Sequence, residues 1–269
     1  MYHRFASLLF LAASTVSMPA WGKALTPVEN WVVDYREDQC LATRRYGDLA
    51  KPVTLAVRPA PNGETYELLL SKPGSASTAA AEAKGAVDFG GGEIKAWLLS
   101  YGTKGSQSKV YQFRIPAAEM AQAASATTVT LRPEGEAPVT FSLSSMKALL
   151  DTLRVCTADL QKYWNADGER LGAIATPSKG DVRGVFTAND YPADAIYRNQ
   201  GGTSQFLLLI DEKGSVAGCH VQKASGIPVL DAMGCQVIRL RSKFSPARDR
   251  SGKPVRSTVV TPPIVWRME

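Results

Sequence analysis

The sequence predicts an α+β protein in two parts: a mostly β N-terminal domain ending in a helix, and a C-terminal module ordered helix, strand, strand, helix, strand. Short β-prone runs separated by Gly and Pro fill the first part, and apolar residues with helical spacing follow over residues 144–164. After residue 190, segments with strand-like and helix-like patterns follow one another. The chain has 269 residues, 45% hydrophobic and 21% charged, which is an ordinary globular composition and long enough for two cored domains.

The first residues have the pattern of a secretory signal. A charged start at Arg4 precedes an apolar run from Phe5 to Met18, and small residues follow it. The run is shorter than the ~20 residues that a membrane-spanning helix needs. We therefore predict a cleaved signal peptide over residues 1–24, and an uncleaved membrane anchor over residues 5–22 is the alternative.

Residues 25–164 are predicted to form the N-terminal domain, with short strands in a sandwich-like or barrel-like arrangement. The strand-like runs lie at residues 52–60, 65–71, 93–102, 109–116 and 128–143. The Ala-rich stretch 76–86 is predicted to be a surface loop. In residues 144–164 apolar side chains recur every three or four positions, so they share one helix face, and Cys156 lies on that face.

Residues 165–188 lack sustained periodicity and are predicted to be a linker to the C-terminal domain at 189–269. In that domain a short helix follows Tyr191, because Pro192 suits a first helical turn. Two strands flank a turn at residues 211–214, and a helix with a buried stripe starts near Pro228. The last strand contains two prolines.

The stretch from Ala217 to Gln236 holds Cys219, His220 and Cys235. Strand alternation places Cys219 and His220 on opposite faces, so the two cannot converge on one metal ion. A redox pair would be expected as a CxxC motif at a helix start, which is absent. We therefore predict a disulfide between Cys219 and Cys235, with no metal and no cofactor, and we place His220 on the solvent face.

Four cysteines in an exported chain indicate two disulfides, with three possible pairings. We predict the pairing that stays within each domain. Cys40 is then expected to join Cys156.

Ser144 and Lys147 have the SxxK spacing of penicillin-binding serine acyltransferases, at a predicted helix start. Helix capping by Ser144 or Ser145 is the competing interpretation, and the companion SDN and KTG motifs are missing. His220 is the one histidine outside the signal, so a Ser/His/Asp triad has little basis. We expect no enzyme activity, with a serine acyl hydrolase using Ser144 and Lys147 as a further alternative.

The region from Arg239 to Arg256 is strongly basic, with Asp249 as its single acid, in a chain of net charge +6. Aromatic residues for base stacking are missing apart from Phe244, so nucleic acid is not an expected partner. A solvated helix end and loop is one interpretation. Contact with an acidic partner or with cell-wall carboxylates is the other.

Five motifs follow one another near the C-terminus: "YPADA", "FLLLIDEKGSV", "SGIPVLDAMGC", "FSPARDRSGKPV" and "PIVW". Together they resemble the C-terminal domain of the TonB family, over residues 185–269. The resemblance implies a small periplasmic α+β domain with an antiparallel sheet. It also implies docking on an outer-membrane transporter or envelope protein, whose extended segment adds as a strand to the sheet edge.

Carried over by position, the resemblance assigns the partner contacts to two segments. They are Asn189, Asp190, Tyr191 and Pro192 around the YP motif, and Val259, Val260, Thr261, Ile264, Val265 and Trp266 in the final strand. Pro262 and Pro263 remove two amide donors from that strand, so its edge is expected to offer fewer hydrogen bonds than an ideal template.

The predicted function is that of a periplasmic, non-catalytic TonB-like protein that binds an extended peptide or transporter segment. An energy transducer anchored in the inner membrane is the alternative. The chain departs from a transducer in its signal-like start, in the missing Pro-rich spacer and in its β-rich domain. The resemblance does not extend to that β-rich domain.

Overall fold

A computed structural model describes residues 23–74, 80–103 and 107–268. The predicted signal peptide and the alternative anchor fall almost wholly on residues 1–22, outside the described residues. Among the described helices, none combines the length and the apolar character needed to cross a membrane.

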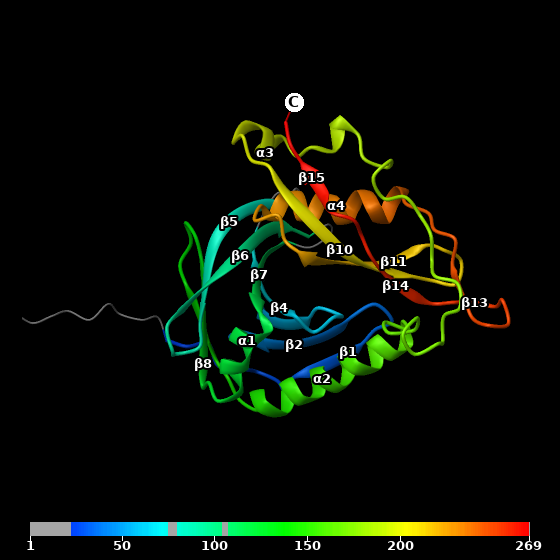
Figure 1. Ribbon diagram of the computed structural model, residues 1–269. Coiled ribbons are helices and arrows are strands. Elements are labelled where there is room, and N and C mark those ends of the chain that lie inside the picture. The colour runs from blue at the N-terminus through cyan, green and yellow to red at the C-terminus, as the bar shows by residue number, and fades with distance from the viewer. Residues whose placement is uncertain (1–22, 75–79, 104–106, 269) are drawn as a thin grey trace, which may run out of the picture.

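Nine antiparallel strands of the N-terminal part form one sheet, in the order β1-β2-β3-β4-β7-β6-β5-β8-β9 (Figure 1). The strands are β1 (Val32–Tyr35), β2 (Cys40–Tyr46), β3 (Val53–Pro59), β4 (Thr65–Pro73), β5 (Ala81–Asp88), β6 (Glu93–Gly102), β7 (Ser108–Pro116), β8 (Thr128–Pro133) and β9 (Val139–Ser142).

The sheet curls until residues 25–28 join its two ends. The Leu25 N–H donates to the Thr140 carbonyl in β9 at 2.8 Å, and the Val28 N–H donates to the Arg45 carbonyl in β2 at 3.0 Å. The one sheet therefore closes into a barrel-like shape, which is one of the two arrangements that the strand pattern predicts. Strands alternate apolar and polar residues in the same way in both architectures, so the pattern does not separate them.

The barrel interior and one long helix form the first core. The helix α2 (Met146–Tyr163) buries the predicted face, and the disulfide Cys40–Cys156 ties it to β2 with a Cα–Cα distance of 6.1 Å. Where the barrel closes, the rings of Tyr46 and Phe141 meet edge to face at 4.8 Å between centroids. The disulfide between Cys40 and Cys156 is thus present as predicted.

The Ala-rich stretch is not the surface loop that the sequence predicts. Its second half belongs to β5, which lies between β6 and β8 in the sheet. A Cβ added to Gly85 would lie 2.8 Å from Cε1 of Phe113, so a small residue is needed to leave room for that ring. Two further elements, α1 (Ala117–Met120) and η1 (Ala121–Ala124), were not predicted.

The C-terminal module has the predicted order of elements. They are η2 (Ala188–Asp190), α3 (Ala193–Tyr197), β10 (Gly202–Ile210), β11 (Val216–Lys223), α4 (Pro228–Arg241), the small hairpin β12 (Ala247–Arg248) and β13 (Pro254–Val255), β14 (Ser257–Val260) and β15 (Ile264–Trp266). The predicted final strand is divided in two, because Pro262 and Pro263 cannot donate to a ladder.

Helix α4 packs closely on the central strand β10. A Cβ added to Gly234 would lie 2.4 Å from Cζ of Phe206, so glycine permits the approach. The predicted disulfide Cys219–Cys235 is present and ties β11 to α4 with a Cα–Cα distance of 5.6 Å. The second core lies between α4 and the β10–β11 face that carries Phe206.

Residues 165–188 run along the C-terminal module. Ile174 and Val182 are buried, and the Thr176 N–H donates to the Arg248 carbonyl at 3.0 Å. Lys179 forms an isolated bridge with Ser245. The segment therefore has fixed contacts with the strands that follow α4.

The N-terminal domain covers the face of the β10–β11 sheet opposite α4 (Figure 1). Leu209 of β10 is fully buried and belongs to the barrel core, and Ala217 of β11 packs against it. At the sheet's margin Glu82 accepts a hydrogen bond from Gln200, and the Arg256 guanidinium lies 4.0 Å from the Tyr163 ring centroid.

Candidate partner-binding edge and interdomain cleft

The C-terminal sheet has two edges with different surroundings. Strand β10 is central, with β11 on one side and β14 followed by β15 on the other. Residues 218–221 of β11 border a cleft against the N-terminal domain. The β14–β15 edge lies on the far side of β10 from that cleft.

The predicted contact residues of the last strand alternate between residues that bind β10 or the core and residues whose side chains are exposed to solvent. Thr261 binds β10 twice: its N–H donates to the Phe206 carbonyl at 2.9 Å, and its Oγ1 accepts from the Phe206 N–H at 3.0 Å. Ladder alternation then directs the N–H of Val260 away from β10. The Val260 side chain is half exposed, at 50%.

Beyond the prolines the strand returns to β10 with its register shifted by one residue. Ile264 pairs with Ser204, whereas Val260 pairs with Leu207. Ile264 and Trp266 are buried, and Val265 between them is 51% exposed. Val259 packs on the second core from the same strand.

The contact residues around the YP motif are mostly held by the module itself. Asp190 is buried and accepts hydrogen bonds from Arg241 at 2.7 and 2.8 Å and from the Thr187 N–H at 2.7 Å. The Arg241 guanidinium lowers the pKa of Asp190 to about 2. Pro192 is buried as well, and Asn189 is exposed.

The two predicted contact segments meet at Trp266. The rings of Tyr191 and Phe186 stand perpendicular to it, with centroid distances of 5.6 and 5.5 Å. The Tyr191 hydroxyl donates to the Gln200 carbonyl at 2.6 Å. An aromatic cluster therefore supports the end of β15.

The start of this edge is already covered. Thr258 lies in a hollow lined by residues 165–170, the Asn165 side chain donates to the Arg256 carbonyl at 2.8 Å, and Ser178 hydrogen-bonds Ser257 at 2.7 Å. The open part of the edge therefore begins at Val260.

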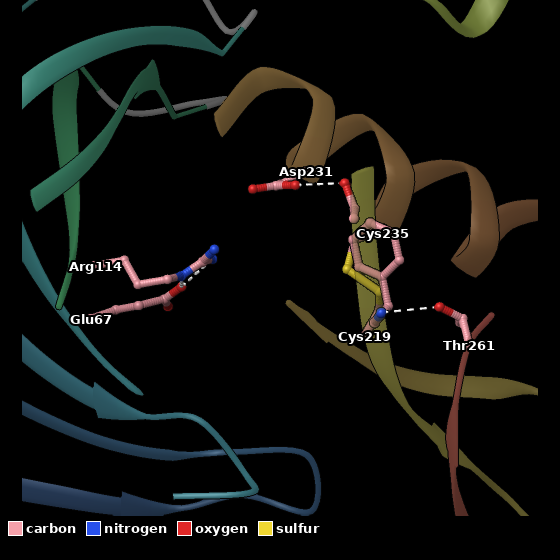
Figure 2. The surroundings of a disulfide bond; sticks show 8 residues. Glu67, Arg114, Cys219, Asp231, Cys235 and Thr261 are labelled. Atoms are coloured by element: carbon pink, nitrogen blue, oxygen red, sulfur yellow. Dashed lines mark hydrogen bonds and ion pairs between the residues drawn. A yellow bond between two sulfur atoms is a disulfide. The ribbon is translucent and has the colours of Figure 1, made fainter. Parts of the chain in front are cut away.

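The interdomain cleft has a charged floor on the barrel (Figure 2). Glu67 accepts hydrogen bonds from both Arg58 and Arg114, each with a contact of 2.8 Å, and from Gln112 at 2.7 Å. Burial opposes ionisation of Glu67, but the two arginines outweigh it and lower its pKa to about 2.

The sequence did not reveal this cluster, because Arg58, Glu67 and Arg114 alternate with core residues on three strands and look like ordinary outward-facing side chains. Only strand pairing brings them together, with Arg58 opposite Glu67 and Glu67 opposite Arg114.

His220 faces this floor and does not lie on a solvent face, as the sequence predicted. It does lie opposite Cys219 on the strand, but the barrel covers its side. Burial, followed by the positive charge of Arg58, lowers the pKa of His220 to about 4, so the imidazole is neutral. Its Nε2 is buried without a hydrogen-bond partner among the described residues.

Ser144 and Lys147 bind different partners, and Ser145 is the residue that precedes the helix. Ser145 precedes α2 without a side-chain capping bond, and the Ser144 hydroxyl accepts from Arg44 Nη1 at 2.8 Å. Lys147 forms an ion pair with Asp151 at 2.9 Å. A protonated guanidinium cannot take a proton from the serine, so the hydrogen-bond partner of the Ser144 hydroxyl among the described residues is not a base.

Several arginines of the basic region 239–256 are bound to other parts of the C-terminal module. Arg241 binds Asp190, Arg248 donates to the Gly252 carbonyl at 2.6 Å, and Arg256 pairs with Glu212 at 3.3 Å. Within the described ranges, no group of three or more His, Cys, Asp or Glu side chains is arranged to hold a metal ion.

The comparison with protein families agrees with this architecture. Residues 187–268 match the family described as Gram-negative bacterial TonB protein C-terminal. The C-terminal part of the chain is therefore a TonB-like C-terminal domain, and the match covers less than a third of the chain. This family comprises non-enzymatic, envelope-associated domains that interact with outer-membrane transporters. No curated protein and no solved structure matches the chain.

Proposed function

We propose that this chain is a periplasmic binding protein whose C-terminal domain takes an extended segment of an outer-membrane transporter or envelope protein as an added strand. The observation that carries the proposal is the open edge from Val260 to Trp266, on a domain that matches the TonB C-terminal family. Main-chain hydrogen bonds supply the affinity in this mode of recognition.

The edge offers donors on both sides of the proline step. By ladder alternation the N–H groups of Val260 and Val265 point away from β10, while Pro262 has none to offer. Exposed valine side chains beside these donors add apolar contact. The opposite edge, β11, is less suited because the N-terminal domain borders it.

The TonB-like domain does not act as a freely tethered unit in this proposal. The barrel covers the sheet face opposite α4, and residues 165–178 cover the start of β14. The N-terminal domain thus restricts the partner to the β14–β15 edge. The exposed Arg239 and Lys243 remain candidates for contact with acidic cell-wall groups.

The test is titration calorimetry of the full exported chain with synthetic peptides from the N-terminal segments of outer-membrane transporters. Val260→Pro removes one outward N–H, and we expect it to weaken binding about 5-fold, corresponding to about 1 kcal/mol for one hydrogen bond. Val265→Lys replaces an exposed valine on the same edge and should also weaken binding. Val32→Lys is the matched control, since Val32 is 58% exposed on β1 of the other domain.

Equal affinity of all these variants for a peptide that binds the parent chain would refute strand addition at this edge. Weakening by Val32→Lys as much as by Val265→Lys would refute it too. Peptides N-methylated at alternate amides provide an independent test. They should bind more weakly than the unmodified peptides, because strand addition requires those N–H donors.

The alternative is an inner-membrane transducer in which residues 5–22 stay as an anchor. Mass measurement of the N-terminus of protein from its native membrane separates the two. A start near Lys23 supports the periplasmic protein, and an intact Met1 supports the anchored one.

A further inference from the structure

The interdomain cleft has the properties of a small-molecule site that is separate from the β14–β15 edge. Its volume is about 290 Å³, at the small end of the range for ligand pockets. Strands of the barrel form its floor, and β11 with α4 forms its roof. Figure 2 shows the two walls facing each other.

The floor presents a fixed donor. Arg114 uses Nε and Nη2 to bind Glu67, which holds the guanidinium plane in place. Its Nη1 has no acceptor among the described residues. Arg239, at the α4 end of the cleft, is exposed and likewise unpaired within the described ranges.

The roof presents acceptors. Asp231 is buried, and its Oδ1 accepts from the Ser204 hydroxyl at 2.7 Å and the Ser225 N–H at 3.0 Å. The other carboxylate oxygen of Asp231 points away from this bond, into the space between the two walls (Figure 2). The buried Nε2 of His220 has no partner among the described residues.

The charges of the lining balance. Three arginines (Arg58, Arg114, Arg239) face three carboxylates (Asp38, Glu67, Asp231). A net anion or a net cation gains little from such a lining. A neutral ligand whose groups both donate and accept matches it, and the imidazole of His220, which can do either, suits a hydroxyl best.

Apolar surface completes the cleft. Trp97 of β6 is 45% exposed at this site, and Leu99, Pro228 and the Cys219–Cys235 disulfide add further apolar contact. An indole face beside hydrogen-bonding groups is suited to the C–H face of a pyranose ring, because the ring has an apolar face and a hydroxyl rim.

We propose that the interdomain cleft binds a neutral saccharide of one or two rings, with one ring against Trp97 and its hydroxyls between Arg114 on the floor and His220 and Asp231 on the roof. This inference is independent of strand addition, because the cleft and the β14–β15 edge lie on opposite sides of β10.

The test is titration of the full exported chain with glucose, N-acetylglucosamine and the N-acetylglucosamine dimer, followed by tryptophan fluorescence and calorimetry. We expect saturable binding of at least one of them with a Kd on the order of 1 mM or tighter. Trp97→Ala removes the indole face and Ala232→Leu fills the cleft from α4, and each should weaken binding at least about tenfold.

Two matched controls separate the site from general effects. Tyr197→Ala removes an aromatic side chain that is 92% exposed on α3, and Ala158→Leu enlarges an exposed alanine on α2. Both should bind sugar as the parent does, and unfolding temperatures should show that all four variants are folded.

The proposal is overturned if none of the three sugars binds, or if binding is unchanged in Trp97→Ala and Ala232→Leu. It is also overturned if only alanyl-alanine or inorganic phosphate binds in parallel titrations, because a zwitterion or an anion would then be the ligand class.

Discussion

Removing the Cys219–Cys235 disulfide should destabilise the protein by about 3 kcal/mol without affecting partner binding. The two cysteines are 16 residues apart in sequence, and the chain-entropy treatment assigns about 3 kcal/mol to closing a loop of that size. For a chain of this length, 1 kcal/mol changes Tm by about 2–4 °C, so the double variant Cys219→Ser/Cys235→Ser should melt about 6–12 °C lower.

The assay is guanidinium unfolding of the full chain, followed by far-UV circular dichroism and tryptophan fluorescence. Cys40→Ser/Cys156→Ser is the matched comparison, because its cysteines are 116 residues apart and the same treatment gives about 5 kcal/mol. Partner peptides should bind the Cys219→Ser/Cys235→Ser variant as they bind the parent, since β10 separates the disulfide from the β14–β15 edge.

A loss of stability below about 1 kcal/mol, measured with an unchanged m-value, would refute the reasoning from loop closure. A free thiol at Cys219 or Cys235 in non-reducing peptide mapping would refute the pairing itself. Loss of peptide binding in a folded variant would show that the two sides of the sheet are coupled.

Three further predictions concern the charged groups. His220 has a pKa of about 4 in the folded chain and an ordinary value near 6.5 when unfolded. Its contribution to the free energy of unfolding is therefore complete above pH 6.5 and falls by about 3 kcal/mol as the pH drops to 4. Unfolding titrations of His220→Gln should show a weaker dependence of that free energy on pH. Glu67→Gln should cost about 3 kcal/mol, because it leaves two arginines facing the interface. Glu136→Gln, at a partly exposed cluster with Lys72 and Lys109, should cost under about 1 kcal/mol in the same denaturation assay. Asp190→Asn should lower the free energy of unfolding by about 2 kcal/mol at pH 7. In the parent chain the stabilisation by ionised Asp190 is present above pH 4 and is lost as the pH falls toward 2. Thermal unfolding of parent and variant at several pH values measures the difference.

Much of the C-terminal domain follows from local sequence. Gly214 and Gly234, the two prolines and the spacing of apolar residues fix the turn, the helix packing and the divided last strand, since each acts on its immediate surroundings. The two disulfides were predicted from the even number of cysteines in a chain expected to be exported and from pairing within each domain, and helix periodicity placed Cys156 on a core-facing side.

The rest depends on contacts between distant segments. Barrel closure depends on Leu25 meeting Thr140, and the burial of His220 depends on which face of β11 the barrel covers. Gly85 of β5 is small because the Phe113 ring lies against it, and a small residue gives no hydrophobic periodicity from which the strand could be predicted. Candidate contact residues such as Asp190 and Thr261 are buried for the same reason: their partners lie on other elements.

The one-residue register shift between β14 and β15 bears on what kind of sequence could lie along this edge. The edge strand takes five residue steps from Val260 to Val265 where β10 takes four from Leu207 to Thr203, so a segment paired residue for residue with the edge would exchange its two faces at Pro262 and Pro263. A segment added to this edge, as we propose, would keep one set of side chains facing the module only if it skipped one residue of the edge, as β10 does.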